Sequence, residues 1–172
     1  ALGGNEDPGK LIGKLIKSNK PIVVNSGSTS GSFADNPSNG GTTQDYGFDQ
    51  IVGADKIGSE YILVKGNGLD SFENVLIIAH FDNTEVKING SNVTSLNRGQ
   101  YYVAEGNLFS SVGNMYLETT KDVFVYQGIG GTNSKANQGL FFVPPLSCEN
   151  KGDVDNIASI DKIGDFTLSG GV

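Results

Sequence analysis

The sequence has no tryptophan, and it has only one cysteine, one histidine and one arginine: Cys148, His80 and Arg98. A lone cysteine excludes an internal disulfide, and one cysteine with one histidine cannot supply the ligands of a zinc site. Basic residues are also few, since 12 Lys and Arg stand against 19 Asp and Glu and the net charge is -7. Nucleic-acid binding is therefore excluded, because a phosphate backbone requires a basic stripe.

Long apolar runs and helical periodicity are absent as well. The longest apolar run covers residues 75–79, far below the roughly 20 residues that a membrane-spanning helix needs. No window repeats apolar residues with the i, i+3, i+4, i+7 spacing of an amphipathic helix. We therefore expect no direct insertion into a membrane and no substantial helix.

The sequence does contain turn residues between short apolar segments, many of which alternate with period two, and Gly alone occupies 25 positions. This pattern predicts an all-β domain, namely an antiparallel β-sandwich or barrel-like fold with long polar loops. About ten strands are expected from the pattern. They cover residues 9–18, 21–26, 60–65, 74–81, 84–89, 92–96, 100–104, 114–119, 122–127 and 139–143.

Three of these strands carry clear local signals. Residues 84–88 alternate in polarity, with the first, third and fifth facing one way, and the Asn89-Gly90 pair that follows predicts a hairpin with a primed turn. The run at 75–79 has no alternation, so we expect a central strand covered on both faces. Residues 123–126 are β-branched or aromatic throughout and are also expected in the interior.

Two stretches rich in Ser, Gly, Asn and Asp interrupt the strands, at residues 26–50 and 128–138. We interpret both as long surface loops, which commonly carry function. A Pro-Pro pair then precedes a polar tail, so we expect one surface-protein domain over residues 1–147 and an exit linker or the start of a following module over residues 148–172. The first residue is not Met and no leader follows it, which suggests a processed or excised piece of a longer chain.

No arrangement typical of an enzyme is visible. His80 lies in an apolar segment without a nucleophile motif, and we expect it to be a packed, hydrogen-bonded strand residue rather than a base. A carboxylate glycosidase is the enzymatic alternative. The glutamates on or beside strands are better explained as solvent-facing residues, and they are Glu60, Glu73, Glu85, Glu105 and Glu118.

The first polar loop holds a group of acidic residues, Asp35, Asp45 and Asp49, and Asp55 follows just beyond it. Carboxylate and carbonyl oxygens can bind calcium, although this spacing is neither an EF-hand nor an Asp-rich nonapeptide repeat. The alternative is that these residues form Asx turns in a solvated loop. Calcium is the one cofactor that the sequence suggests.

Several ordered motifs between residues 11 and 148 carry a resemblance to a known family. They are Lys-Pro-Ile-Val-Val-Asn-Ser-Gly-Ser at 20–28, Asp-x-Gly-x-Asp-Gln-Ile-Val at 45–52, Ile-Gly-x-Glu-Tyr at 57–61, Ala-His-x-Asp-Asn-Thr-Glu-Val at 79–86, Val-Tyr-Gln-Gly at 125–128 and Asn-Gln-Gly-Leu-x-Phe-Val-Pro-Pro-Leu-Ser-Cys at 137–148. In this order they resemble the IgGFc-binding-protein N-terminal domain family, in particular its versions in large surface proteins of gliding and other Bacteroidota.

This resemblance implies an extracellular, non-enzymatic β-domain within a long adhesin or secreted multidomain protein at the cell surface. It does not imply immunoglobulin binding, because the family name comes from a mucosal animal protein and recognition resides in variable sites carried by a fold. The family usually begins upstream of the position at which this chain starts, which leaves room for an initial strand or two before residue 1.

The expected function is a binding or spacer module, and the motifs at the ends of the two polar loops supply the predicted ligand-binding residues. These are Asp45, Tyr46, Asp49, Gln50, Asn137 and Gln138. Such side chains either satisfy loop amides or face outward for recognition, and Asp49 is the test case. The expected ligand is an extracellular protein or a glycan, and the isolated domain is expected to be a monomer. A glycan would use tyrosine ring faces, at Tyr46, Tyr101, Tyr102 or Tyr116.

Overall fold

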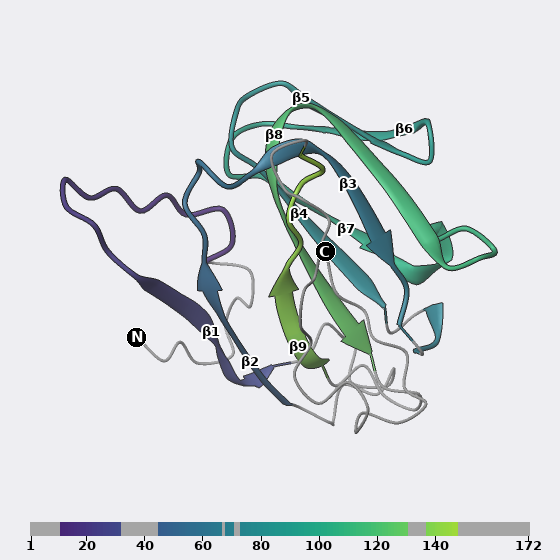
Figure 1. Cartoon of the computed structure of the whole chain (residues 1–172), viewed down its shortest axis with the longest axis horizontal. Helices are drawn as coiled ribbons and strands as arrows, with labels where there is room; N and C mark the ends of the chain where they lie inside the picture. Colours follow the sequence, from purple (N-terminus) through teal and green to yellow (C-terminus); the bar gives the residue numbers. More distant parts are fainter. Residues whose placement is uncertain (1–10, 32–44, 67, 71–72, 131–136, 148–172) are drawn as a thin grey trace.

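A computed structural model describes residues 11–31, 45–66, 68–70, 73–130 and 137–147. Within these residues the regular structure is almost all β, and every ladder between strands is antiparallel (Figure 1). The predicted all-β class is confirmed. The elements are β1 (Val24–Gly31), β2 (Asp45–Ile51), β3 (Gly58–Val64), β4 (Asn74–Ala79), β5 (Thr84–Ile88), β6 (Ser91–Leu96), β7 (Tyr101–Glu105), the short 3₁₀ helix η3 (Gly106–Leu108), β8 (Asn114–Gly130) and β9 (Asn137–Phe142).

The long strand β8 organises a seven-stranded sheet. Its first half pairs with β3 and β5, and its second half pairs with β4 and β9. Strand β6 continues the sheet beyond β5, and β7 continues it beyond β4. The pairing with β3 shifts between Gly58↔Val123 and Glu60↔Glu118, and the extra residues of β8 at this point bend the strand. The sheet therefore curls on itself, as a sandwich or barrel-like domain requires (Figure 1).

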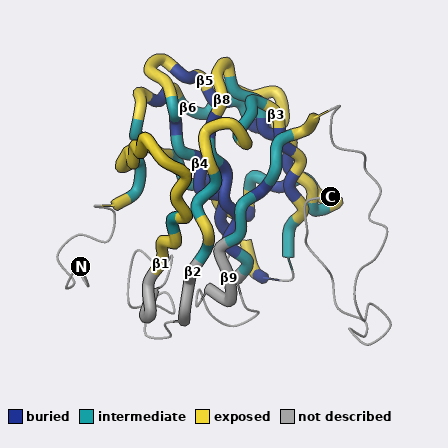
Figure 2. Tube along the Cα trace, turned by 60° about the vertical axis from the view of Figure 1, so that its left-hand side comes forward, coloured by how far each residue is buried: buried dark blue, intermediate teal, exposed yellow. Residues whose placement is uncertain are grey.

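The hydrophobic core lies inside this curled sheet, where Figure 2 shows the buried residues gathered along β3, β4 and β8. Tyr61 ties β3 to β8 beside the register shift. Its hydroxyl donates a hydrogen bond to the carbonyl oxygen of Val123 at 2.6 Å and accepts one from the amide of Gly58 at 2.9 Å. Burial raises the pKa of Tyr61 to about 12, because the ionised phenol would lose its hydration.

The hairpin predicted at residues 84–90 is confirmed. Thr84, Val86 and Ile88 are buried while the residues between them are more exposed, and the turn residues Asn89 and Gly90 have φ angles of 50° and 82°. These positive angles are those of a primed turn. The side chain of Asn89 also accepts a hydrogen bond from the amide of Tyr116 and donates one to the carbonyl of Leu108, which fixes the turn against β8.

The two interior predictions are also confirmed. β4 lies between β8 and β7, and Ile78 is its only residue that is not fully buried. Val123, Val125 and Tyr126 of β8 are buried as well. An apolar run without alternation therefore correctly predicted the central strand of the sheet.

The prediction of a continuous polar loop at residues 26–50 was wrong at both ends. β1 and β2 cover these ends and pair with each other as a separate two-stranded sheet, while residues 32–44 lie outside the described ranges. A strand pair satisfies its backbone through ladder hydrogen bonds, so a surface pair can form from Ser, Thr and Gly without apolar side chains. In the second predicted loop, β8 likewise continues through Gly130 and β9 begins at Asn137.

Four of the predicted strands need correction. Residues 11–18, the described part of the strand predicted at 9–18, form a turn and an irregular segment with exposed apolar side chains. The strands predicted at 114–119 and 122–127 are the single strand β8, in which the Thr119 hydroxyl donates to the Lys121 carbonyl at 2.8 Å and holds the chain through its irregularity. β4 ends at Ala79, two residues earlier than predicted.

Two further observations concern the ends and the membrane prediction. No helix among the described residues is long and apolar enough to cross a bilayer. The predicted boundary between a domain at 1–147 and a linker or module at 148–172 stays a prediction, because the second segment lies outside the described residues.

Candidate binding site

The carboxylate of Asp49 connects the small β1–β2 sheet to the large sheet. Strands β2 and β9 lie side by side and run in the same direction (Figures 1 and 2). Asp49 of β2 accepts a hydrogen bond through Oδ2 from the amide of Phe142 in β9 at 3.0 Å, and through Oδ1 from the amide of Gln50 at 2.7 Å. The Asp49 side chain thus satisfies two backbone donors. Of the two roles predicted for it, amide support and ligand recognition, this contact matches amide support.

This arrangement brings the two predicted ligand-binding motifs together. The backbone of Asp45 and Tyr46 begins β2, and the backbone of Asn137 and Gln138 begins β9. Because the two strands run alongside each other in the same direction, both motifs lie at the same end of the pair. The side chains of these four residues lie outside the described part of the structure, whereas Gln50 is exposed. Their role in ligand binding stays a prediction.

The calcium hypothesis is likewise untested at its main positions. Asp35 and the side chain of Asp45 lie outside the described residues, and both oxygens of Asp49 accept amide hydrogen bonds. Asp55 is exposed and forms an ion pair with Lys56 at 3.4 Å. Among the side chains that are described, no three His, Cys, Asp or Glu come close enough to hold a metal ion.

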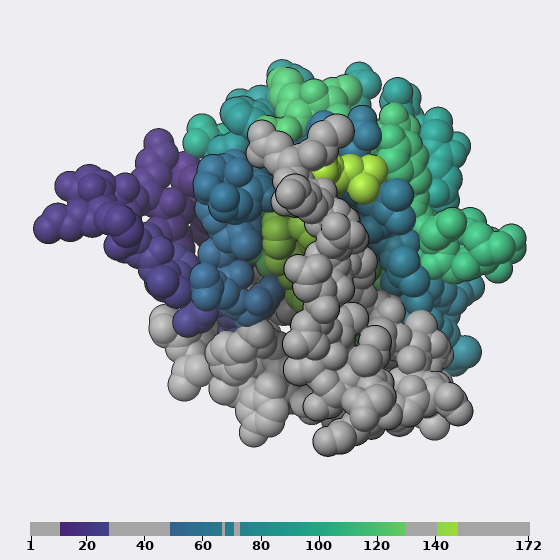
Figure 3. All heavy atoms as spheres, in the orientation of Figure 1, coloured from purple at the N-terminus to yellow at the C-terminus, as the bar shows by residue number. Residues whose placement is uncertain are grey.

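A cleft of about 720 Å³ opens next to the junction of β2 and β9. It lies between the segment that joins β2 to β3 and the segment that follows β9, and Figure 3 shows these two parts of the chain in contact. The amide of Leu146 donates to the carbonyl of Glu60 at 2.8 Å, and Pro145 lies so close to Gly58 that a side chain there would collide with it. The residues that line the cleft are Val52, Asp55, Lys56, Ile57, Gly58, Ser59, Glu60, Asp122, Phe142, Pro144, Pro145, Leu146 and Ser147.

The cleft combines apolar walls with an acidic rim. Phe142, Pro144 and Pro145 are half-buried, and the lining also includes the exposed acidic residues Asp55, Glu60 and Asp122. Lys56 is its one basic residue, so negative charge dominates the cleft. Such a surface favours a ligand that presents positive charge beside apolar groups.

The sequence pattern does not indicate this cleft, because it marks the Pro-Pro pair only as the end of the domain and Glu60 only as a solvent-facing residue. The signal that could have pointed to the cleft is that three motifs of the resemblance, at 45–52, 57–61 and 137–148, supply most of its walls. Only the fold shows that these segments, far apart in the chain, meet at one place.

Tyr126 lies beneath the β2–β9 junction, where its ring contacts Phe142 edge to face at 5.7 Å. Its hydroxyl is buried and has no partner with hydrogen-bond geometry among the described atoms. Burial raises the pKa of Tyr126, the nearby charge of Asp49 raises it further, and the backbone of Val52 opposes this change. The junction is therefore a closely packed support for the cleft beside it.

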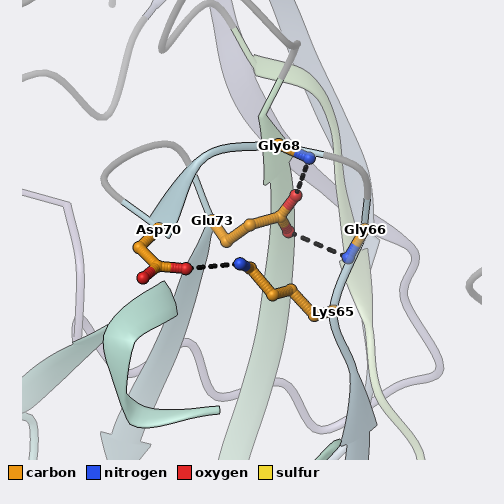
Figure 4. Close-up of polar contacts among 5 residues, drawn as sticks. All are labelled: Lys65, Gly66, Gly68, Asp70 and Glu73. Atoms are coloured by element: carbon orange, nitrogen blue, oxygen red, sulfur yellow. Dashed lines mark hydrogen bonds and ion pairs between the residues drawn. The ribbon is translucent and has the colours of Figure 1, made fainter. Parts of the chain in front are cut away.

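Glu73 contradicts the expectation that the strand-flanking glutamates face solvent. It is fully buried, and its carboxylate accepts hydrogen bonds from the amides of Gly68 at 2.8 Å and Gly66 at 3.3 Å (Figure 4). Lys65 and Asp70 of the same connection form an ion pair beside it. Because both oxygens of Glu73 hold the backbone that joins β3 to β4, this carboxylate supports a turn rather than a reaction.

The other predicted aromatic and histidine sites are placed as follows. His80 packs edge to face against Phe81 and Phe124, with ring centroids 4.7 and 5.9 Å apart, which confirms the packing predicted for it. It lies just past the end of β4, so its placement in a strand was wrong, and its hydrogen bond stays a prediction. Tyr101 and Tyr116 are exposed. Tyr102 packs against the core and is a poor candidate for stacking on a sugar.

One family model matches the chain. It is described as IgGFc binding protein, and the match covers residues 6–159. No curated protein matches, and neither does any solved structure. The matched range contains the β2–β9 junction and every residue that lines the cleft.

Proposed function

Because this chain belongs to the IgGFc binding protein family, as its motifs predicted, we propose that it recognises an extracellular protein ligand at the acidic cleft beside the β2–β9 junction. Membership in a family of extracellular binding domains sets the general role. The cleft is the described surface that best fits this role, since it joins an apolar wall, an acidic rim and a rigid support.

The fuller assignment is an adhesin-type domain at the cell surface, within a large protein of the kind found in gliding Bacteroidota. The resemblance of the sequence motifs supports this context. In such a protein the domain either binds a ligand or spaces other domains, and the cleft favours binding because a spacer has no need of one. Immunoglobulin is one protein to test, on account of the family name, and it has no special support from the residues.

A protein ligand fits the cleft better than a glycan does. The acidic lining residues Asp55, Glu60 and Asp122 complement lysine or arginine side chains, and the wall of Phe142 and the two prolines complements apolar ones. A glycan site usually offers a flat aromatic platform, but the chain has no tryptophan. Among the tyrosines whose side chains the structure describes, the exposed Tyr101 and Tyr116 do not line the cleft.

The test is a binding comparison with a matched control. The double variant Glu60→Gln/Asp122→Asn removes two rim charges without changing side-chain size. The control Glu85→Gln/Glu105→Gln removes two exposed charges from β5 and β7, away from the cleft. Each protein is tested on whole cells, mucin, immunoglobulin G and a polysaccharide panel.

We expect the rim variant to bind its target about tenfold more weakly, while the control binds as the wild type does. Equal binding by both variants would exclude the cleft as the recognition site. Binding confined to polysaccharides and unaffected at the rim would favour the glycan alternative, and failure to bind any target would favour a spacer.

A further inference from the structure

The segment before β1 forms an arm, defined as residues 11–23, with an unusual number of exposed apolar side chains. They are Leu11, Leu15, Ile16, Ile22 and Val23, and each is at least half exposed. Single exposed apolar residues are common on proteins, whereas a group of this size within one short segment marks a surface that another molecule covers.

The arm is fixed at its base and projects from the body. The backbone of Gly13 lies directly against Gly99 in the turn between β6 and β7, so closely that a side chain on Gly13 would collide with the Gly99 carbonyl. Residues 14–23, which follow this contact, are all exposed. The arm extends beyond β1 and β2, away from the large sheet (Figure 3). It is therefore presented outward rather than folded onto its own domain.

The charge of the arm is opposite to that of the remaining chain. Lys14, Lys17 and Lys20 alternate with its apolar residues, and residues 11–23 contain no acidic residue, although the net charge of the whole chain is -7. The exposed acidic residues Asp55, Glu60 and Asp122 are meanwhile among the residues that line the cleft, together with apolar ones. Arm and cleft thus match in both charge sign and apolar content.

From this complementarity we propose that the arm of one copy docks into the acidic cleft of a second copy of the chain. The inference rests on the proposed binding role of the cleft and names a partner for it. Two arms would not pair with each other readily, because their six lysines would repel. Since different surfaces meet in this contact, it is heterologous, and successive copies would form a chain or a closed ring.

The experiment measures mass by sedimentation equilibrium of the 172-residue chain from about 1 µM to about 500 µM, a range that covers weak and moderate dissociation constants. The arm variant is Lys17→Glu/Lys20→Glu, and the cleft variant is Glu60→Lys/Asp122→Lys. The control Glu85→Lys/Glu105→Lys reverses two exposed charges on β5 and β7, away from the arm and the cleft. Matching thermal melts establish that each variant is folded.

We expect the mass of the wild type and the control to rise above 18.1 kDa with concentration, and less so at high salt because screening weakens charge pairs. Each double variant alone should stay a monomer. An equimolar mixture of the two should form a one-to-one dimer, because the arm variant keeps an intact cleft and the cleft variant keeps an intact arm.

Three results would overturn the proposal. The first is a wild type that stays monomeric at every concentration, as the sequence predicts. The second is a cleft variant that still self-associates, and the third is a mixture of the two variants that forms no dimer. Failure of the proposed function is separate, because it is judged on the outside targets with Glu60→Gln/Asp122→Asn. If that variant loses its target while the wild type is a monomer, the cleft binds a different protein.

Discussion

The carboxylate of Asp49 on β2 accepts a hydrogen bond from the amide of Phe142 on β9, 3.0 Å away and 93 residues further along the chain. The backbones of these two strands share no ladder, because β2 pairs only with β1 among the described strands. A side chain therefore provides the polar link between the small sheet and the large one. Phe142 also lines the cleft, so this link positions one wall of the proposed binding site.

Replacement of Asp49 by Ala should destabilise the domain by about 1 to 3 kcal/mol, because the partly buried amide of Phe142 loses its acceptor. The midpoint of urea unfolding measures this loss. Asp49→Asn is the control, since its side-chain oxygen can still accept one amide hydrogen bond and the loss should be smaller. Unchanged stability together with lost target binding would instead assign Asp49 to ligand recognition.

The parts of the fold that sequence could predict are those whose signals are local. The turn at Asn89-Gly90 requires positive φ angles that few residues adopt, so two residues were enough to locate it. The run that became β4 was identified as central because continuous apolar residues require cover on both faces. In both cases the residues themselves carry the constraint.

The parts that sequence could not predict depend on distant neighbours. Strands β1 and β2 are polar on the whole, and only their pairing across residues 32–44 makes them strands. Glu73 looks like any other glutamate near a strand, and its burial is explained by two amides that the turn between β3 and β4 directs at it. The cleft likewise exists only where three separate segments meet.

Gly90→Val should destabilise the domain by about 1 to 3 kcal/mol, because Val disfavours a positive φ. A side chain at position 90 would meet no atom within 4 Å, so the cost is conformational and not a collision. Gly90→Asn should cost less, since Asn adopts such angles more readily. Urea unfolding of both variants tests this, and an unchanged midpoint for Gly90→Val would remove the role assigned to the turn.

The stability of the domain should fall in alkaline solution because of Tyr61. Its pKa in the folded protein is about 12, against 10.0 for the ordinary group, so the unfolded chain loses this proton first. The contribution of Tyr61 is complete below pH 10 and falls by about 1.4 kcal/mol per pH unit as the pH rises toward 12. The free energy of unfolding, measured with urea at several pH values across this range, should fall less steeply with pH for Tyr61→Phe than for the wild type. Equal dependence on pH in the two proteins would contradict the raised pKa.

Calcium should raise the melting temperature if the acidic residues of the β1–β2 region bind it, because a ligand that binds only the folded state stabilises that state. The comparison is a thermal melt in millimolar-scale calcium against one in chelator. Asp35→Asn should abolish any increase, whereas Glu85→Gln on β5 should leave it unchanged. Superimposed melts in calcium and chelator would end the calcium hypothesis.

The titration of Glu73 should stabilise the wild type at acidic pH, when its free energy of unfolding is compared with that of a variant that has no titrating group at position 73. Burial raises the pKa of Glu73 above 4.5, although the Gly68 and Gly66 amides and the charge of Lys65 oppose this. The folded state therefore holds the proton more tightly than the unfolded chain does, and the contribution of Glu73 falls as the pH rises from 4.5 through the folded pKa.

Glu73→Gln provides the reference, because it fills the same space without a titrating proton. At pH 4 it should cost little, because the protonated carboxyl group, like Gln, offers one carbonyl oxygen to the two amide donors. As the pH rises, ionisation of the buried group destabilises the wild type, so its stability relative to Glu73→Gln in urea unfolding should be higher at pH 4 than at pH 7. An advantage that is larger at pH 7 would mean that the two amides lower the pKa of Glu73 more than burial raises it, and the carboxylate would then stabilise the turn as an ion.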